Sequence, residues 1–228
     1  DLWGVVHNGS VGFPWARDCL VELQKLRKPV LFLSNSSRRC ATNQAALERL
    51  GISPDLYVDL ITSGEVSWKI LKGTCAVMDE MAAIRDAKAI LTFGNGSDDV
   101  EYMADLPAEV AVNASEADLL LARGCFSLYG DEVRSASCED FDVALREAAK
   151  RGVPMLVANP DVVRPDGNAS PMPGRLAQRY QELGGPDAIF VGKPYPEVFQ
   201  LARERLEEAG VPSSARLCMV GDSVRHDV

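Results

Sequence analysis

The chain has 228 residues, and its 33 acidic residues outnumber its 24 lysines and arginines, which gives a net charge of −9. Hydrophobic residues make up 46% of the chain and charged residues 25%, an ordinary composition for a globular protein with a buried core. No apolar run approaches the roughly 18 residues that a membrane helix needs, and the glycines and prolines are dispersed, which excludes membrane-spanning, collagen-like and disordered proteins. The acidic balance argues against nucleic acid, so we expect neither a nucleic-acid nor a membrane partner.

The cysteines are spaced too widely for a zinc site or a compact disulfide framework. No two of the six lie two or three residues apart in the sequence (Cys19, Cys40, Cys75, Cys125, Cys138 and Cys218). This spacing favours free thiols in a reducing compartment, and we therefore predict a cytoplasmic protein.

Short apolar runs alternate along the chain with amphipathic helical patterns, such as those over residues 16–23 and 198–206. The expected strands cover residues 29–33, 57–61, 89–91, 119–121, 155–157, 188–191 and 217–220. This alternation predicts a doubly wound α/β fold with a parallel sheet. In such folds ligands bind beyond the carboxyl ends of the strands, so the residues at those ends are the candidates for a site.

Polar residues follow two of the expected strands. Ser34 and the three residues after it lead from the run 29–33 into a helical pattern, and a hydroxyl with free backbone N–H groups at such a turn can bind an anion. The same residues are also typical of a helix N-cap. Lys193 follows the run 188–191, where a fixed cation can neutralise a phosphate, although most lysines are simply solvated.

Carboxylates occur after the last expected strand and at the first residue. Asp222 follows the run 217–220 and Asp227 lies five residues further on, and such a pair suits Mg²⁺, a hard cation with oxygen ligands. A helix-capping role for Asp222 is the alternative. Asp1 precedes several glycines that indicate tight turns rather than a long regular element.

The order of these residues resembles the four motifs of the haloacid dehalogenase superfamily. The matching positions are Asp1, then Ser34-Asn35, then Lys193-Pro194, then Gly221-Asp222-Ser223 with Asp227. More narrowly, the chain is similar to class IIA, the phosphatases related to NagD, pyridoxal phosphatase and phosphoglycolate phosphatase, in its branch that opens with Asp-x-Trp-Gly-Val-x-His-x-Gly. The segments 33–39, 62–65, 158–161 and 192–194 match that branch as well, so the resemblance spans essentially the whole chain.

The resemblance implies a Rossmann-like core with an inserted α/β cap domain. The core would comprise residues 1–73 and 173–228, and the cap would comprise residues 74–172 with the strands near Ala89, Leu119 and Met155. The cap would close over the site, exclude water and select the substrate, and it would be the surface through which a homo-oligomer forms. Family members have further strands beyond both ends of this sequence, so we expect a fragment without them to fold poorly.

The resemblance also implies a role for each matching residue. Asp1 would be the nucleophile, and Mg²⁺ would be held by Asp1, the main-chain carbonyl of Trp3 and Asp222. Ser34 and Lys193 would stabilise the transition state, and Asp227 would orient Lys193 or a metal-bound water. The residues expected to bind the substrate are Asn35, Ser36, Asn159 and Lys193, and the supporting residues are Asp227, Ser223 and His7. Asn159 opens a segment that either faces the active site or forms a plain turn.

Trp3 departs from the family pattern, because phosphatases of this superfamily usually carry a general acid/base Asp at this position. An indole does not exchange a proton near neutral pH, and the loss of a general acid typically costs about 10²–10⁴-fold in rate. Activity would then persist on substrates whose leaving group needs little protonation, or with His7 or a metal-bound water in place of the missing acid. Otherwise the chain would bind a phosphorylated ligand or partner without useful turnover, or it would serve only as a scaffold. We predict a hydrolase of small phosphorylated metabolites, with the binding protein as the alternative.

Overall fold

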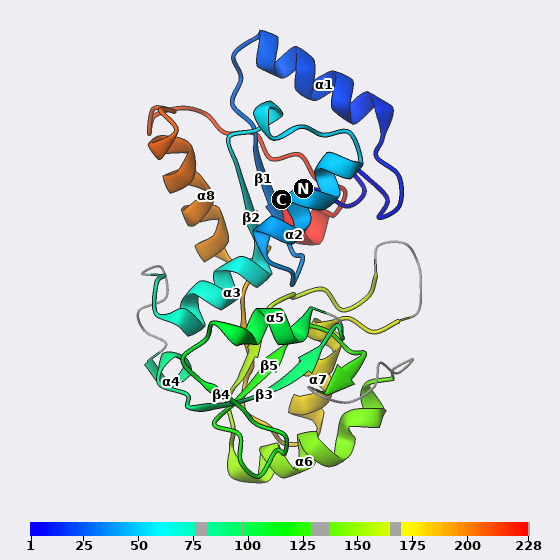
Figure 1. Ribbon diagram of the computed structural model, residues 1–228, viewed down its shortest axis with the longest axis vertical. Helices are drawn as coiled ribbons and strands as arrows, with labels where there is room; N and C mark the ends of the chain where they lie inside the picture. Colours follow the sequence, from blue (N-terminus) through cyan, green and yellow to red (C-terminus); the bar gives the residue numbers. More distant parts are fainter. Residues whose placement is uncertain (76–81, 97, 129–136, 165–169, 228) are drawn as a thin grey trace.

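The computed structural model describes residues 1–75, 82–96, 98–128, 137–164 and 170–227. These residues form two β-sheets, built mainly of parallel strands, with flanking helices (Figure 1). The first sheet consists of β1 (Leu31–Ser34) and β2 (Asp59–Thr62), which pair from Leu31 opposite Asp59 to Ser34 opposite Thr62. The helices around it are α1 (Pro14–Lys25), α2 (Cys40–Arg49), η1 (Pro54–Leu56), α3 (Ser63–Lys72), α8 (Pro196–Glu208) and the short α9 (Val224–Asp227).

The second sheet has the strand order β4-β3-β5-β7-β8, and all four of its neighbouring pairs are parallel. Its strands are β3 (Ala89–Gly94), β4 (Glu109–Val110), β5 (Leu119–Ala122), β7 (Met155–Val157) and β8 (Ile189–Phe190), with β6 (Ser127–Leu128) antiparallel to β3. The accompanying helices are α4 (Ala82–Arg85), α5 (Asp99–Ala104), η3 (Cys138–Phe141), α6 (Asp142–Arg151) and α7 (Pro173–Glu182). The expected α/β fold is therefore confirmed.

Alternating side chains of the strands divide the core into clusters. In β1, Leu33 packs in a cluster with α3, α4 and α5, whereas the neighbouring Phe32 packs in another with α1 and α2. In β5, Leu119 and Leu121 join the first of these clusters, whereas Leu120 faces α6 and α7 on the other side. Successive side chains of a strand point to opposite faces, so each strand buries apolar residues on both sides. The cluster around α3 contains residues of both sheets, and it joins the two halves of the molecule.

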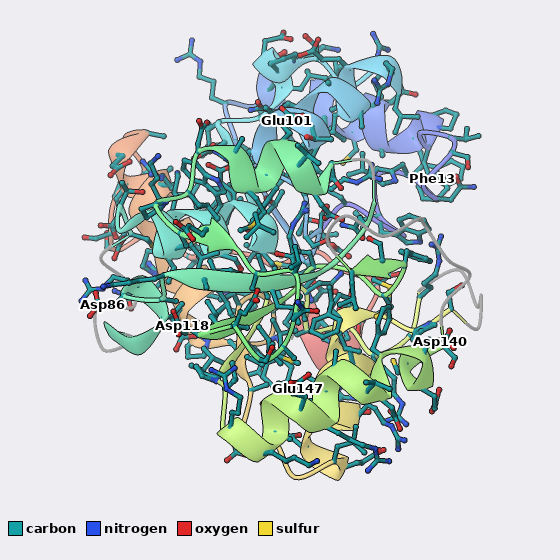
Figure 2. The ribbon with its side chains drawn as sticks, turned by 60° about the horizontal axis from the view of Figure 1, so that its bottom comes forward. Phe13, Asp86, Glu101, Asp118, Asp140 and Glu147 are labelled. Carbon is teal, nitrogen blue, oxygen red and sulfur yellow. The ribbon has the colours of Figure 1, made fainter. Side chains whose placement is uncertain are left out.

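The acidic excess of the chain lies largely on the surface. The five acidic residues labelled in Figure 2 are all exposed (Asp86, Glu101, Asp118, Asp140 and Glu147). No helix among the described residues is long and apolar enough to cross a membrane. All six cysteines are free thiols, as their spacing predicts.

The segment 217–220 does not form the strand that its apolar residues predict. Leu217 and Val220 are 45% and 60% exposed, and no regular element includes them. A strand needs a neighbouring backbone along its length, whereas this segment receives a backbone hydrogen bond only at Val220, whose carbonyl accepts from the main-chain nitrogen of Asp1 at 3.1 Å. The expectation of a strand here is therefore wrong for this structure.

The second sheet also continues beyond the expected end of the cap at Met172. Tyr180 of α7 packs in the cluster beside β5 and β7 and donates to the carbonyl of Val153, and β8 pairs with β7. Residues 173–190, which we expected in the core, thus belong structurally with the strands expected in the cap. The apolar run 188–191 does form a strand, but it completes the second sheet rather than the first. The domain limits as such stay a prediction.

Candidate active site

A buried lysine lies between two carboxylates from opposite ends of the chain. Lys193 Nζ lies 2.9 Å from Asp1 Oδ1 and also contacts the carboxylate of Asp227. The side chains of Lys193 and Asp227 are only 3% and 2% exposed, and that of Asp1 is 11% exposed. Removing a charge from water is costly unless an opposite charge accompanies it, so the three groups hold one another in place.

Asn35, at the carboxyl end of β1, holds the backbone of Lys193. Its Oδ1 accepts from Lys193 N at 2.7 Å, and its Nδ2 donates to Lys193 O at 3.0 Å. The preceding Gly192 has φ of 132°, and a Cβ there would lie 2.7 Å from Asn35 Oδ1 and 2.4 Å from Ser63 Oγ. This position therefore requires glycine. Asn35, which we expected to contact substrate, is seen to position the lysine.

Three carboxylates gather beside this lysine. Asp1, Asp222 and Asp227 each offer an oxygen within 4.8 Å of the others. Asp227 is already engaged, because its Oδ1 contacts Lys193 and its Oδ2 accepts from Ser223 N at 3.1 Å. Asp222 is exposed, and a Cβ on Gly4 would lie 2.0 Å from its Oδ2, so this carboxylate lies directly against the backbone that follows Trp3. The hard oxygen donors of this cluster fit a divalent cation such as Mg²⁺.

The serines after β1 form a compact turn. Ser34 Oγ accepts from Ser36 N at 3.2 Å, and Ser36 Oγ accepts from Arg38 N at 3.4 Å. Ser34 and Ser37 are buried, and helix α2 begins only at Cys40. The N-cap role of these serines is not observed, because the residue before α2 is Arg39 and no side chain caps it.

Trp3 and His7 lie together in the turn that follows Asp1. Their rings make an edge-to-face contact with centroids 5.9 Å apart, and the guanidinium of Arg164 lies 5.7 Å from the Trp3 ring centroid. His7 Nδ1 accepts from Gly9 N at 2.9 Å, and burial lowers the pKa of this imidazole. The hydrogen bond from Gly9 N engages Nδ1 and leaves Nε2 as the ring nitrogen that could exchange a proton.

Asp161 belongs to the segment 159–161, for which the sequence left a place at the active site or a plain turn open, and its carboxylate lies at the same site. Asn35 Nδ2 donates to Asp161 Oδ1 at 2.8 Å, and His226 Nε2 lies 3.7 Å from the same oxygen. Burial raises the pKa of Asp161 despite the hydrogen bond from Asn35. Asn159 is buried and its Oδ1 accepts from Asp161 N at 2.8 Å, which is a local turn contact. Ser223 Oγ lies 2.9 Å from His226 Nδ1.

A carboxylate, a buried lysine and two further carboxylates thus meet beside Asn35, at the carboxyl end of β1. Residues 1–106 match the sequence pattern of the haloacid dehalogenase-like hydrolases. Human Chronophin is 30% identical over 237 residues, which cover all of this chain and 74% of that protein. The chain belongs to the haloacid dehalogenase-like hydrolases, in class IIA of that superfamily.

Solved structures agree with this assignment. A haloacid dehalogenase-like hydrolase from Brucella suis superposes with a TM-score of 0.81 at 25% identity, over the whole of this chain and 80% of that one. A glycerol phosphate phosphatase from Mycobacterium tuberculosis, solved in complex with magnesium, has a TM-score of 0.63 at 21% identity, over 91% of this chain and 57% of that one. The predicted enzyme class, a phosphatase of the haloacid dehalogenase type, is confirmed at the level of the family.

Proposed function

We propose that this chain hydrolyses the phosphate monoester of a small metabolite with Mg²⁺ as cofactor, through a phosphoryl group carried by Asp1. The observation that carries the proposal is the contact of the Asp1 carboxylate with the buried ammonium of Lys193, beside Asp222 and Asp227. A carboxylate next to a fixed cation can approach a negatively charged phosphoryl group, because the cation neutralises part of that charge.

In the first step, an Asp1 carboxylate oxygen attacks phosphorus and the bond from phosphorus to the alcohol oxygen breaks, so that the phosphoryl group passes to Asp1 and the leaving oxygen takes its proton from solvent water. Lys193 and the Ser34 hydroxyl face the charge that spreads over the phosphoryl oxygens. In the second step, water attacks phosphorus and the bond from phosphorus to the Asp1 oxygen breaks. Inorganic phosphate leaves with one proton of that water, the other passes to solvent, and the Asp1 carboxylate is regenerated. Asp227 keeps the ammonium of Lys193 in position through both steps.

The carboxylates of Asp1 and Asp222 and the carbonyl of Trp3 would hold the metal. When bound, Mg²⁺ supplies positive charge that neutralises the phosphoryl oxygens. Magnesium in the glycerol phosphate phosphatase supports this choice of ion. Asp227 is the least suited of the three clustered carboxylates, because both of its oxygens already have partners.

Trp3 reduces the expected rate, because the leaving alcohol oxygen gains no proton from an indole. We expect turnover about 10²–10⁴-fold below that of an enzyme with an acid at this position. The alternative function, binding of a phosphorylated ligand or partner without turnover, is favoured by the same residue. Its ring contacts His7 and Arg164, so it is packed as an aromatic surface and has no proton to exchange.

The test is release of inorganic phosphate from glycerol phosphate and other small phosphomonoesters, with Mg²⁺ and with a chelator. Asp1→Asn is expected to abolish release, and Asp18→Asn, at an exposed position of α1, is the matched control. Trp3→Asp is expected to raise release, with Trp15→Asp at a 67% exposed position as its control. Release that persists in Asp1→Asn would exclude Asp1 as the nucleophile. If neither the parent chain nor Trp3→Asp releases phosphate, the binding function replaces the hydrolase.

A further inference from the structure

Ser37, in the loop after β1, is held by the second sheet, although its neighbours are held by the first half of the molecule. Gly64 N at the start of α3 donates to Ser36 O at 2.9 Å, and Thr62 Oγ1 donates to Arg38 O at 2.7 Å. Between these two anchored carbonyls, Ser37 receives its hydrogen bonds from residues that follow β3 and β5. The loop at the candidate anion site is thus fixed jointly by both halves.

Asn95 and Arg123 make these contacts to Ser37. Asn95 Nδ2 donates to Ser37 Oγ at 3.0 Å, and Arg123 Nη2 donates to Ser37 O at 3.4 Å. The ends of β3 and β5 approach closely here, since a Cβ on Gly124 would lie 2.3 Å from Gly94 O and 2.4 Å from Asn95 Oδ1. This close approach places the two donors side by side beneath Ser37.

Arg123 is itself rigidly placed. It is 1% exposed, its Nη2 lies 3.0 Å from Asp98 Oδ2, and its Nη1 contacts the carboxylate of Asp99. Its guanidinium carbon lies 3.7 Å from the ring centroid of Tyr102, whose hydroxyl donates to Gly64 O at 2.8 Å. A buried ion pair adds little net stability. The planar guanidinium of Arg123, once fixed by its two carboxylate partners, determines where the Ser37 carbonyl can lie.

We infer that Asn95 and Arg123 are positioning residues for phosphate binding, which set the geometry of the loop 34–37 through Ser37. This inference rests on the proposed function, in which that loop faces the phosphoryl group. Neither residue needs to touch the substrate. Loss of their contacts frees Ser37 between two anchored neighbours, and the serine and backbone donors of the loop then lose their alignment.

The experiment measures the affinity of the chain for inorganic phosphate in the presence of Mg²⁺, by calorimetry, in Asn95→Ala, Ser37→Ala and the double variant. Each single change is expected to weaken binding about fivefold, the factor that one ordinary hydrogen bond supplies. Because both changes remove the same hydrogen bond, the double variant is expected to bind about as weakly as either single one. Asn113→Ala, at an exposed position before β5, is the matched control and is expected to bind like the parent.

Arg123→Lys supplies a second line of evidence, because lysine keeps the charge between Asp98 and Asp99 but loses the fork of donors. It is expected to weaken phosphate binding and to raise KM more than it lowers kcat. Parent-like phosphate affinity in Asn95→Ala and Ser37→Ala would overturn the inference, as would strictly additive losses in the double variant. The parent chain is measured before the variants. If it binds no phosphate, the proposed function is refuted, and the inference that rests on it falls as well.

Discussion

Replacement of Lys193 by methionine tests whether the buried cation holds the site together. Methionine keeps an unbranched chain of similar length but leaves Asp1 and Asp227 without their shared ammonium, and the Asp227 side chain is only 2% exposed. Removal of one partner from a buried ion pair costs about 3–5 kcal/mol. Because Asp1 has some access to solvent and Asp227 keeps its contact to Ser223 N, we expect a loss of about 3 kcal/mol.

For a chain of this size, such a loss lowers the melting temperature by about 6–12 °C. The assay is thermal unfolding in a chelator, with Lys28→Met at an exposed position as the matched control. A double variant that also carries Asp227→Asn removes the uncompensated charge, and it is expected to regain part of the loss. A destabilisation below about 1 kcal/mol in Lys193→Met, or no recovery in the double variant, would refute this account of the site.

Two further predictions concern pH and stability. Burial raises the pKa of Glu65, but the hydrogen bonds from Arg39 and from Cys40 N outweigh burial and lower it below 4.5. Glu65→Gln should therefore cost about 1.5–3 kcal/mol in urea unfolding at neutral pH, and the difference from the parent should shrink as pH falls below 4.5; a constant difference would contradict the ion pair. Burial lowers the pKa of His7 below 6.5, so as pH falls below 6.5 the unfolded chain takes up a proton at this histidine before the folded chain does. The melting temperature should therefore fall on acidification, and less so in His7→Asn. Equal acid sensitivity of the two proteins would exclude His7 as the cause.

The apolar runs of the sequence predicted strands at the edges of the sheets as well as inside them, as β1, β2, β5, β7 and β8 show. The run 119–121 becomes β5 with both faces buried, because a continuous apolar run suits a strand between two layers of helices. The sequence predicted the strand at 217–220 wrongly, since periodicity reports which residues prefer burial and not which backbone lies beside them. The sequence also predicted the strand at 188–191 correctly. It did not predict that β8 pairs with β7, because that pairing is a contact between distant segments.

The candidate site likewise contains residues that the sequence identified and contacts that only the folded structure reveals. Lys193 and Asp227 were identified by their place after apolar runs and by the family resemblance. Asp1 was identified as the first residue of the resembling pattern, and the structure brings the three into contact. The contact of Asn35 with substrate stays a prediction, whereas its hold on the backbone of Lys193 is visible only in the structure. Asp161 lies more than a hundred residues from Asn35, so nothing in local sequence indicates the hydrogen bond between them.

The class of the protein follows from the amino-acid sequence, because the four motifs and their order specify the chemistry of the site. The sequence also shows the departure at Trp3, since the identity of a side chain decides whether it exchanges a proton. The hold of the second sheet on Ser37, through Asn95 and Arg123, becomes visible only in the folded molecule. The physical reason is that motif chemistry resides in single residues, whereas burial, charge compensation and alignment arise from groups that meet only when distant segments pack together.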